Sequence, residues 1–116
     1  NNTETRSLLL AKERIKKEHL KLYSYAEYSP EVWFRYQEIL PEITTSDPKS
    51  YPKENVFYIA TNDHTETNLN QLKKLGWQLQ YIGRYDDNEA KAPSKNNVPR
   101  KIHYLYKVTK QVDKNN

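Results

Sequence analysis

The stretch Val56–Trp77, with the sequence VFYIATNDHTETNLNQLKKLGW, decides the fold more than any other part of the chain. Its first six residues, 56–61, are rich in branched and aromatic side chains and show little alternation. This pattern predicts a central strand that is covered on both faces. Asp63, followed three residues later by Glu66, resembles a capping box and predicts a helix from about Thr65 to Leu75.

The end of this helix is also marked in the sequence. Leu69, Leu72 and Leu75 recur at three-residue steps and predict a buried stripe. Gly76 follows the last of them and predicts a left-handed C-cap, after which Trp77 packs back on the helix.

Two alternating segments follow the helix. Apolar and polar residues alternate from Trp77 to Tyr85 and again from Ile102 to Thr109, which is the period of half-buried strands. We expect the two strands to pair in antiparallel fashion. A polar and basic loop, residues 86–100, joins them, and residues 111–116 are expected to form a flexible tail.

The N-terminal part of the chain carries helical patterns. Apolar residues within 5–26 recur at three- and four-residue steps. A second helix is indicated by Ser29 and Pro30 at its start and by Pro41 after its end. We therefore expect a helical hairpin over residues 3–40, followed by a Pro-rich connector over residues 41–54.

The expected fold class is α+β, with this helical hairpin packed on a strand, helix and β-hairpin unit over residues 55–110. A length of 116 residues favours a single small domain over residues 1–116. The polar helix followed by a hairpin with a basic loop resembles the recognition helix and wing of a winged-helix protein over residues 63–109. That resemblance is one of architecture, and it implies DNA binding.

Composition excludes several classes of protein. The chain has no cysteine and only two glycines, so thiolate metal sites, disulfides and glycine-rich phosphate loops are absent. Its mean hydropathy is −1.09, and its apolar runs are too short to span a bilayer, so we expect no membrane partner and a cytoplasmic location. The net charge of +4 permits a polyanionic partner.

No catalytic constellation is evident. His19, His64 and His103 fall on different predicted elements and show no metal-binding spacing. They are expected to lie at a helix interface, in a turn and on a solvent-facing strand position, respectively. Acidic residues near Asp86 are best explained as a solvated turn. We therefore expect no enzymatic activity, no cofactor and no metal.

Aromatic residues on the two C-terminal strands suggest a platform for stacking nucleic-acid bases, flanked by cations. The rings are Tyr81, Tyr85, Tyr104 and Tyr106. Core packing under the helices is the favoured alternative for this face. The opposite face is then the better candidate for an exposed surface, and it carries Gln80, Ile82, Arg84, His103, Leu105 and Lys107.

These observations favour a small nucleic-acid-binding domain, with DNA preferred over RNA as the partner, that binds through the polar helix and the basic hairpin loop. A protein interaction or assembly module, using the aromatic hairpin or the basic first helix, is the alternative. The expected nucleic-acid contacts are Thr65, Thr67, Asn68, Gln71, Lys74, Arg84, Lys91, Lys95, Arg100, Lys101 and Lys107.

Overall fold

The structure is a computed structural model that describes residues 7–28, 30–88 and 101–110. Its elements, in chain order, are a 3-10 helix Leu8–Leu10, α1 (Ala11–Lys17), β1 (Leu22–Tyr25), α2 (Glu31–Tyr36), β2 (Glu42–Ile43), a 3-10 helix Pro48–Ser50, β3 (Val56–Thr61), α3 (Glu66–Lys73), β4 (Gln78–Asp86) and β5 (Ile102–Thr109). The fold is therefore mixed α and β, as expected.

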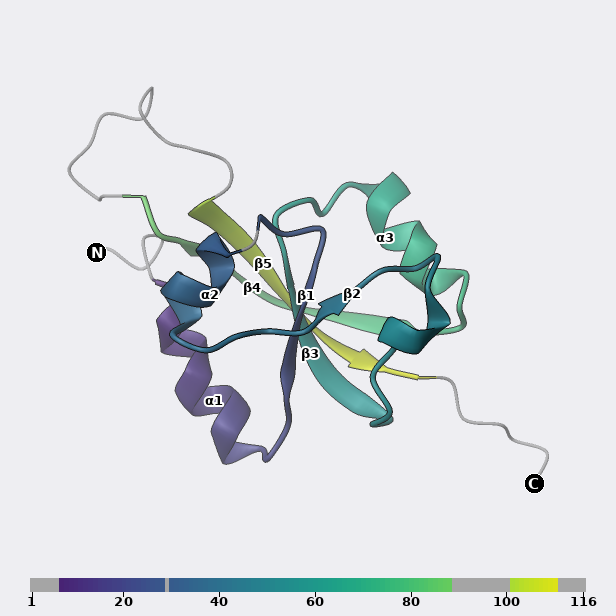
Figure 1. Ribbon diagram of the computed structural model, residues 1–116, viewed down its shortest axis with the longest axis horizontal. Coiled ribbons are helices and arrows are strands. Elements are labelled where there is room, and N and C mark those ends of the chain that lie inside the picture. The colour runs from purple at the N-terminus through teal and green to yellow at the C-terminus, as the bar shows by residue number, and fades with distance from the viewer. Residues whose placement is uncertain (1–6, 29, 89–100, 111–116) are drawn as a thin grey trace.

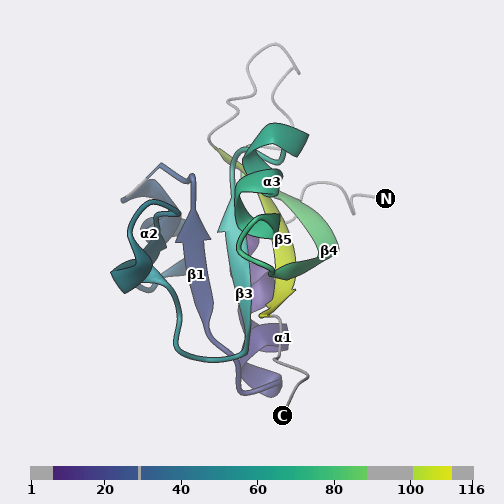
Figure 2. The ribbon, with the colours of Figure 1, turned by 90° about the vertical axis from the view of Figure 1, so that its right-hand side faces the viewer.

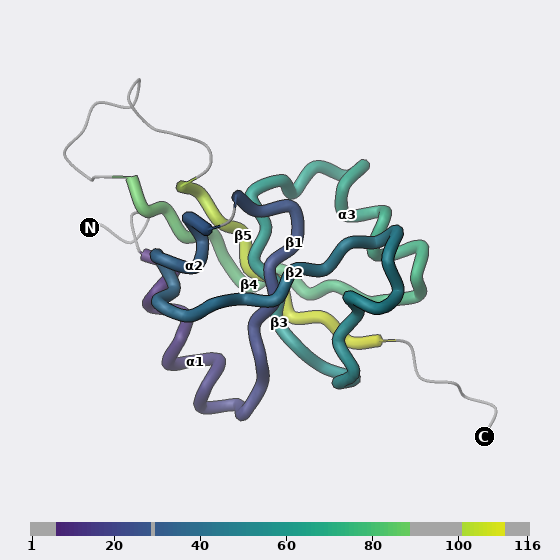
Figure 3. Tube along the Cα trace, viewed as in Figure 1, coloured from purple at the N-terminus to yellow at the C-terminus, as the bar shows by residue number. Residues whose placement is uncertain are grey.

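A five-stranded sheet with the order β2-β1-β3-β5-β4 forms the centre of the structure. Strand β1 runs parallel to β2 and β3, whereas β5 runs antiparallel to β3 and β4. Helices α1 and α2 lie on one face of the sheet and α3 lies on the other (Figures 1 and 2). The trace in Figure 3 shows how β1 and β3 run side by side through the middle.

The prediction of a central strand over residues 56–61 is confirmed. Strand β3 lies between β1 and β5, and residues 57–61 are fully buried. Phe57 and Ile59 belong to the core under α3, whereas Tyr58 and Ala60 belong to the core under α1 and α2. A strand between two helical layers needs apolar side chains on both faces, which explains the missing alternation.

The predicted N-terminal helical hairpin is wrong. Helix α1 ends at Lys17, and strand β1 separates it from α2. Both faces of β1 are buried, so all its residues point into a core. Leu22 is buried whether its segment forms a short strand or the apolar stripe of a helix. Hydrophobic periodicity alone therefore does not distinguish the two structures. His19 has a φ of 58° in the turn after α1 and is exposed, so it is not the helix-interface residue that we expected.

Helix α2 begins where expected but is short. Gln37 adopts a left-handed conformation with a φ of 63° and ends it, so Ile39 and Leu40 lie beyond the helix. The expected N-cap, Ser29, lies outside the described residues. The connector over 41–54 contains β2 and the second 3-10 helix.

Specific residues cap both ends of helix α3. The N-cap is Thr65, whose Oγ1 accepts a hydrogen bond from the Asn68 N–H at 3.2 Å. Asp63, the cap expected from the sequence, accepts a bond from the Thr65 N–H instead, at 3.0 Å. Gly76 has a φ of 89°, which confirms the predicted left-handed cap. The predicted leucine stripe is also confirmed, since it joins Trp77 in the core under α3.

The described residues contain no helix that is both long and apolar enough to cross a membrane. Within these same residues, no group of three His, Asp or Glu side chains is arranged to hold a metal ion.

Candidate nucleic-acid interface

A β-bulge in β4 decides which side chains meet on the α3 face of the sheet. Tyr81 pairs with Tyr106, but Gly83 pairs with Leu105, so the register shifts by one residue between them. Successive strand residues point to opposite faces. One extra residue therefore reverses which residues of β4 point to the α3 face beyond the bulge. Arg84 consequently pairs with Tyr104 and joins the face that carries Tyr81.

Four aromatic side chains gather on this face, and we call them the aromatic patch: His64, Tyr81, Tyr104 and Tyr106. The His64 ring stacks on the Tyr104 ring, with a centroid distance of 3.7 Å and an interplanar angle of 5°. Nδ1 of His64 lies 2.7 Å from the Tyr106 hydroxyl oxygen. Tyr81 meets Tyr106 edge to face at 5.4 Å. These contacts fix the orientation of every ring in the patch.

The patch presents some of its rings to solvent. Tyr81 is 51% exposed and His64 is exposed, whereas Tyr104 is half-buried and Tyr106 is buried. Burial raises the pKa of both the Tyr81 and the Tyr106 hydroxyls, so both stay neutral at physiological pH. The patch therefore offers preoriented aromatic rings to a flat apolar ligand.

Arg84 supplies a cation on the same face. Its guanidinium Nη2 lies 3.5 Å from Oδ2 of Asp86, and its side chain keeps 40% of its surface exposed. The Asp86 side chain is buried, with 7% of its surface exposed, so the exposed part of the Arg84 guanidinium is the part that a phosphate can reach.

One of the four predicted platform rings lies elsewhere. Tyr85 falls beyond the bulge and is buried in the core under α1 and α2. Lys107 also points to that side, where its Nζ lies 3.2 Å from Glu18. The expected exposure of this opposite face is wrong for its central part, because helices cover it there and both His103 and Leu105 are completely buried, whereas Gln80 nearer the start of β4 is exposed.

The polar helix α3 presents part of the predicted set. Thr65, Thr67, Gln71 and Lys74 are exposed. Asn68 is half-buried, and its side-chain amide donates to the carbonyl of Asp63 at the start of the helix. Lys101 is half-buried just before β5. Lys91, Lys95 and Arg100 lie outside the described residues.

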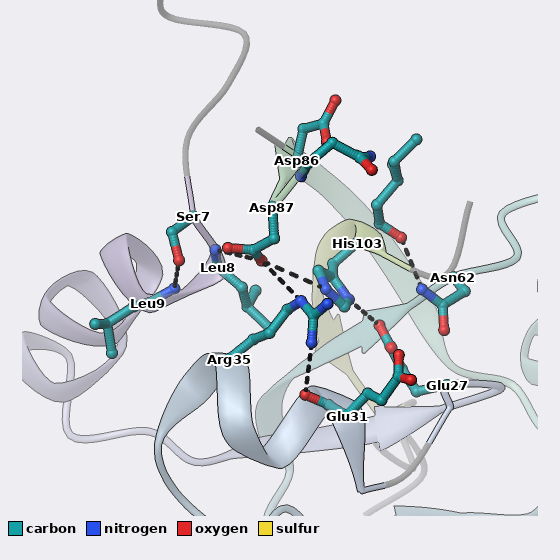
Figure 4. Close-up of polar contacts among 12 residues, drawn as sticks. Ser7, Leu8, Leu9, Glu27, Glu31, Arg35, Asn62, Asp86, Asp87 and His103 are labelled. Carbon is teal, nitrogen blue, oxygen red and sulfur yellow. Dashed lines mark hydrogen bonds and ion pairs between the residues drawn. The ribbon is translucent and has the colours of Figure 1, made fainter. Parts of the chain in front are cut away.

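A second polar cluster lies on the other side of the sheet. His103 contributes Nδ1, 2.7 Å from Oε2 of Glu27, and Nε2, 3.6 Å from Oδ2 of Asp87 (Figure 4). Arg35 and the Leu8 N–H also approach Asp87, at 3.9 Å and 3.3 Å. The cluster thus connects α2, β5, the end of β4 and the loop after β1.

This buried cluster is organised for structure rather than for contact with a ligand. Burial raises the pKa of the Glu27 carboxyl, although its hydrogen bond with His103 opposes that effect. His103 is 0% exposed, so its ring offers no surface to a substrate. The expectation of a solvent-facing His103 is therefore wrong, because α1 and α2 cover the face on which it lies.

Sequence reasoning missed two residues of these clusters. His64 was expected only as a turn residue, because its stacking partner is 40 positions away and no local pattern joins them. Glu27 stands in a polar segment without any motif, and only its tertiary contact with His103 identifies it.

No protein-family model, curated protein or solved structure matches this chain.

Proposed function

We propose that this protein binds single-stranded nucleic acid at the aromatic patch. The observation that carries the proposal is the stacked pair of His64 and Tyr104 beside the half-exposed ring of Tyr81. Single strands are held by bases that stack on aromatic side chains, and every base has a face that can do so.

The arrangement suits a strand that crosses β4 and β5. Tyr81 offers its ring to one base, and the exposed His64 ring, supported from below by Tyr104, offers a second surface. Arg84 pairs with Tyr104 across the two strands. In this proposal its guanidinium contacts a phosphate between the two bases. A fixed ring loses little freedom when a base stacks on it, which favours binding.

Stacking, rather than charge, dominates this proposal. Arg84 contributes one phosphate contact, and Asp86 lies beside it. For single strands, the slope of log affinity against log salt is about −0.7 per phosphate contact. A binder that depends on rings therefore has a shallow salt dependence and keeps much of its affinity at high salt.

A duplex-binding version of the same function uses α3 in the manner of a winged-helix recognition helix. The exposed Thr67, Gln71 and Lys74 favour it, because these residue types contact base edges and phosphates. The two versions differ in the preferred ligand. Stacking on the patch requires an open strand, whereas α3 reads a groove.

The test compares binding of a fluorescent oligothymidine, an RNA of matched length and a DNA duplex. Replacing Tyr81 by Ala is expected to weaken single-strand binding by about 1–3 kcal/mol, the usual contribution of one stacked base. Tyr81→Phe keeps the ring and is expected to bind like the wild type. Fluorescence anisotropy measures all three ligands at two salt concentrations.

Lys107→Gln is the matched control, because it removes a cation from the opposite face of the same hairpin. If Lys107→Gln weakens binding as much as Tyr81→Ala, the effect comes from net charge and the patch is not the site. If the protein instead prefers the duplex, and Gln71→Ala and Lys74→Gln remove that preference, then α3 is the binding site.

The alternative of a protein partner is favoured by a different surface. Phe34 and Ile39 are 73% and 74% exposed, and with Trp33 they line a shallow hollow of about 460 Å³ beside α2. Exposed apolar surface of this kind is typical of protein interaction sites. It lies on the α2 side of the sheet, so a protein partner there and a nucleic acid on the patch do not compete.

A further inference from the structure

Strand β4 forms an edge of the sheet, with β5 as its neighbour on one side (Figure 2). It is nine residues long, whereas β2 at the other edge has two. Proteins usually protect an edge with a short strand, a charged side chain or a proline, because an open edge pairs with other strands. The segment 78–82, with the sequence QLQYI, has no charged side chain and no proline, and the bulge of β4 lies at its end, between Tyr81 and Gly83.

The register identifies which backbone groups of β4 point outward. Lys110 donates its N–H to the carbonyl of Asn55, so even-numbered residues of β5 bond to β3 and odd-numbered ones bond to β4. Gln80 pairs with Lys107, so its backbone N–H and C=O form hydrogen bonds with β5. Leu79 lies between two such pairs, so its N–H and C=O point away from the sheet. Tyr81 is two residues further along β4, so its N–H and C=O also point away from the sheet.

We infer that β4 pairs with β4 of a second copy of this chain, in antiparallel orientation, about a two-fold axis at Gln80. In this register Leu79 of one copy lies opposite Tyr81 of the other, and each pair exchanges backbone hydrogen bonds. The two Gln80 residues meet at the axis. Both sheets then continue into one another, and the two aromatic patches lie on the same face.

A second copy fits this edge because the segment is complementary to itself. Pairs must join residues on the same face, and this register sets apolar Leu79 against aromatic Tyr81 in both halves. The two Gln80 side chains are exposed, and their amides can donate to and accept from each other. The charged Arg84 and Asp86 fall outside the paired segment, so the axis brings no like charges together.

The test uses the centre of the proposed interface. Sedimentation equilibrium is expected to show a monomer–dimer equilibrium for the wild type between micromolar and near-millimolar concentrations. Gln80→Lys and Gln80→Glu each set two like charges opposite one another, and each is expected to dimerise roughly two- to fivefold more weakly. An equimolar mixture of the two variants brings opposite charges together and is expected to restore or exceed wild-type dimerisation.

Gln71→Lys is the control, because it adds the same charge on the exposed side of α3. It is expected to dimerise like the wild type. The inference is overturned if the wild type is monomeric throughout the range. It is also overturned if the wild type dimerises but the mixture associates no more tightly than either Gln80 variant alone. Tyr81 belongs to both the aromatic patch and the proposed interface, but the Gln80 variants leave every ring of the patch unchanged, so the dimerisation test is read independently of the proposed binding function.

Discussion

At the scale of the residue, His103 shows how one side chain joins distant parts of the chain. Its ring bonds Glu27 and approaches Asp87, and its partners are 76 and 16 positions away. Among the described side chains, Oε1 of Glu27 and Nε2 of His103 are buried without a hydrogen-bond partner. The loss of one member is costly at such a site, because it leaves a buried polar group without its hydrogen bond.

We therefore predict that His103→Leu lowers the free energy of unfolding by roughly 3–5 kcal/mol, since it removes the side-chain hydrogen bond of the buried Glu27 carboxyl. The double variant Glu27→Leu with His103→Leu removes both members and is expected to be more stable than the single variant. Urea denaturation of the two single variants and the double variant measures this coupling. Strictly additive losses would show that the two side chains do not depend on each other.

Tyr23 and Glu54 form a second residue-scale link, with a hydroxyl-to-carboxylate distance of 2.7 Å. This hydrogen bond lowers the pKa of Glu54, although burial opposes it. A carboxyl whose pKa is lowered by folding stabilises the protein above its unfolded pKa, and this contribution disappears as pH falls through the folded pKa.

We predict that Tyr23→Phe returns the pKa of Glu54 toward its ordinary value and moves the onset of acid unfolding to higher pH. NMR titration of the Glu54 carboxyl measures the first effect, and circular dichroism against pH measures the second. Glu18→Gln is the control. The pKa of Glu18 is also lowered, but by a hydrogen bond with Tyr58, so this variant leaves the hydrogen bond between Tyr23 and Glu54 in place. An unchanged Glu54 titration in Tyr23→Phe would assign the lowered pKa to another group.

At the scale of the element, Gly76 fixes the boundary between α3 and β4. Its φ of 89° belongs to the region that side chains disfavour. We predict that Gly76→Ala costs about 1 kcal/mol or more of stability. Gly83→Ala is the matched control, because an added Cβ there meets its nearest neighbour, Cε1 of Tyr85, at an ordinary 3.7 Å. Equal costs at both positions in chemical denaturation would remove the strain explanation.

Elements with a local signal were predictable, and those without one were not. The composition of residues 56–61 predicts strand β3. The spacing of the leucines predicts helix α3, and the glycine at position 76 predicts its C-terminal cap. Strand β1 does not, because its residues continue the spacing of the preceding helix and only the sheet distinguishes them. The two-residue β2 has too little sequence to carry any pattern.

The candidate site was predictable only in part, for the same reason. Alternation placed Tyr81, Tyr104 and Tyr106 on a common face. The bulge at Gly83 then moved Arg84 onto that face and Tyr85 off it, and a bulge has no signal stronger than one glycine. His64 reached the patch through tertiary structure alone.

At the scale of the whole molecule, three candidate binding surfaces are divided between the two faces of the sheet. The aromatic patch and the outer side of α3 lie on one face, and the exposed Phe34 and Ile39 lie with α2 on the other. We propose that nucleic acid binds at the patch. A map of the bound state therefore decides among these surfaces more directly than an affinity does.

That map is a titration of the ¹⁵N-labelled protein with an oligothymidine, followed by NMR chemical shifts. We predict that the largest changes fall on His64, Tyr81, Arg84 and Tyr104 and that Tyr81→Ala reduces them. Changes confined to α2, changes confined to α3, or no changes at ligand excess would contradict the assignment of nucleic-acid binding to the aromatic patch.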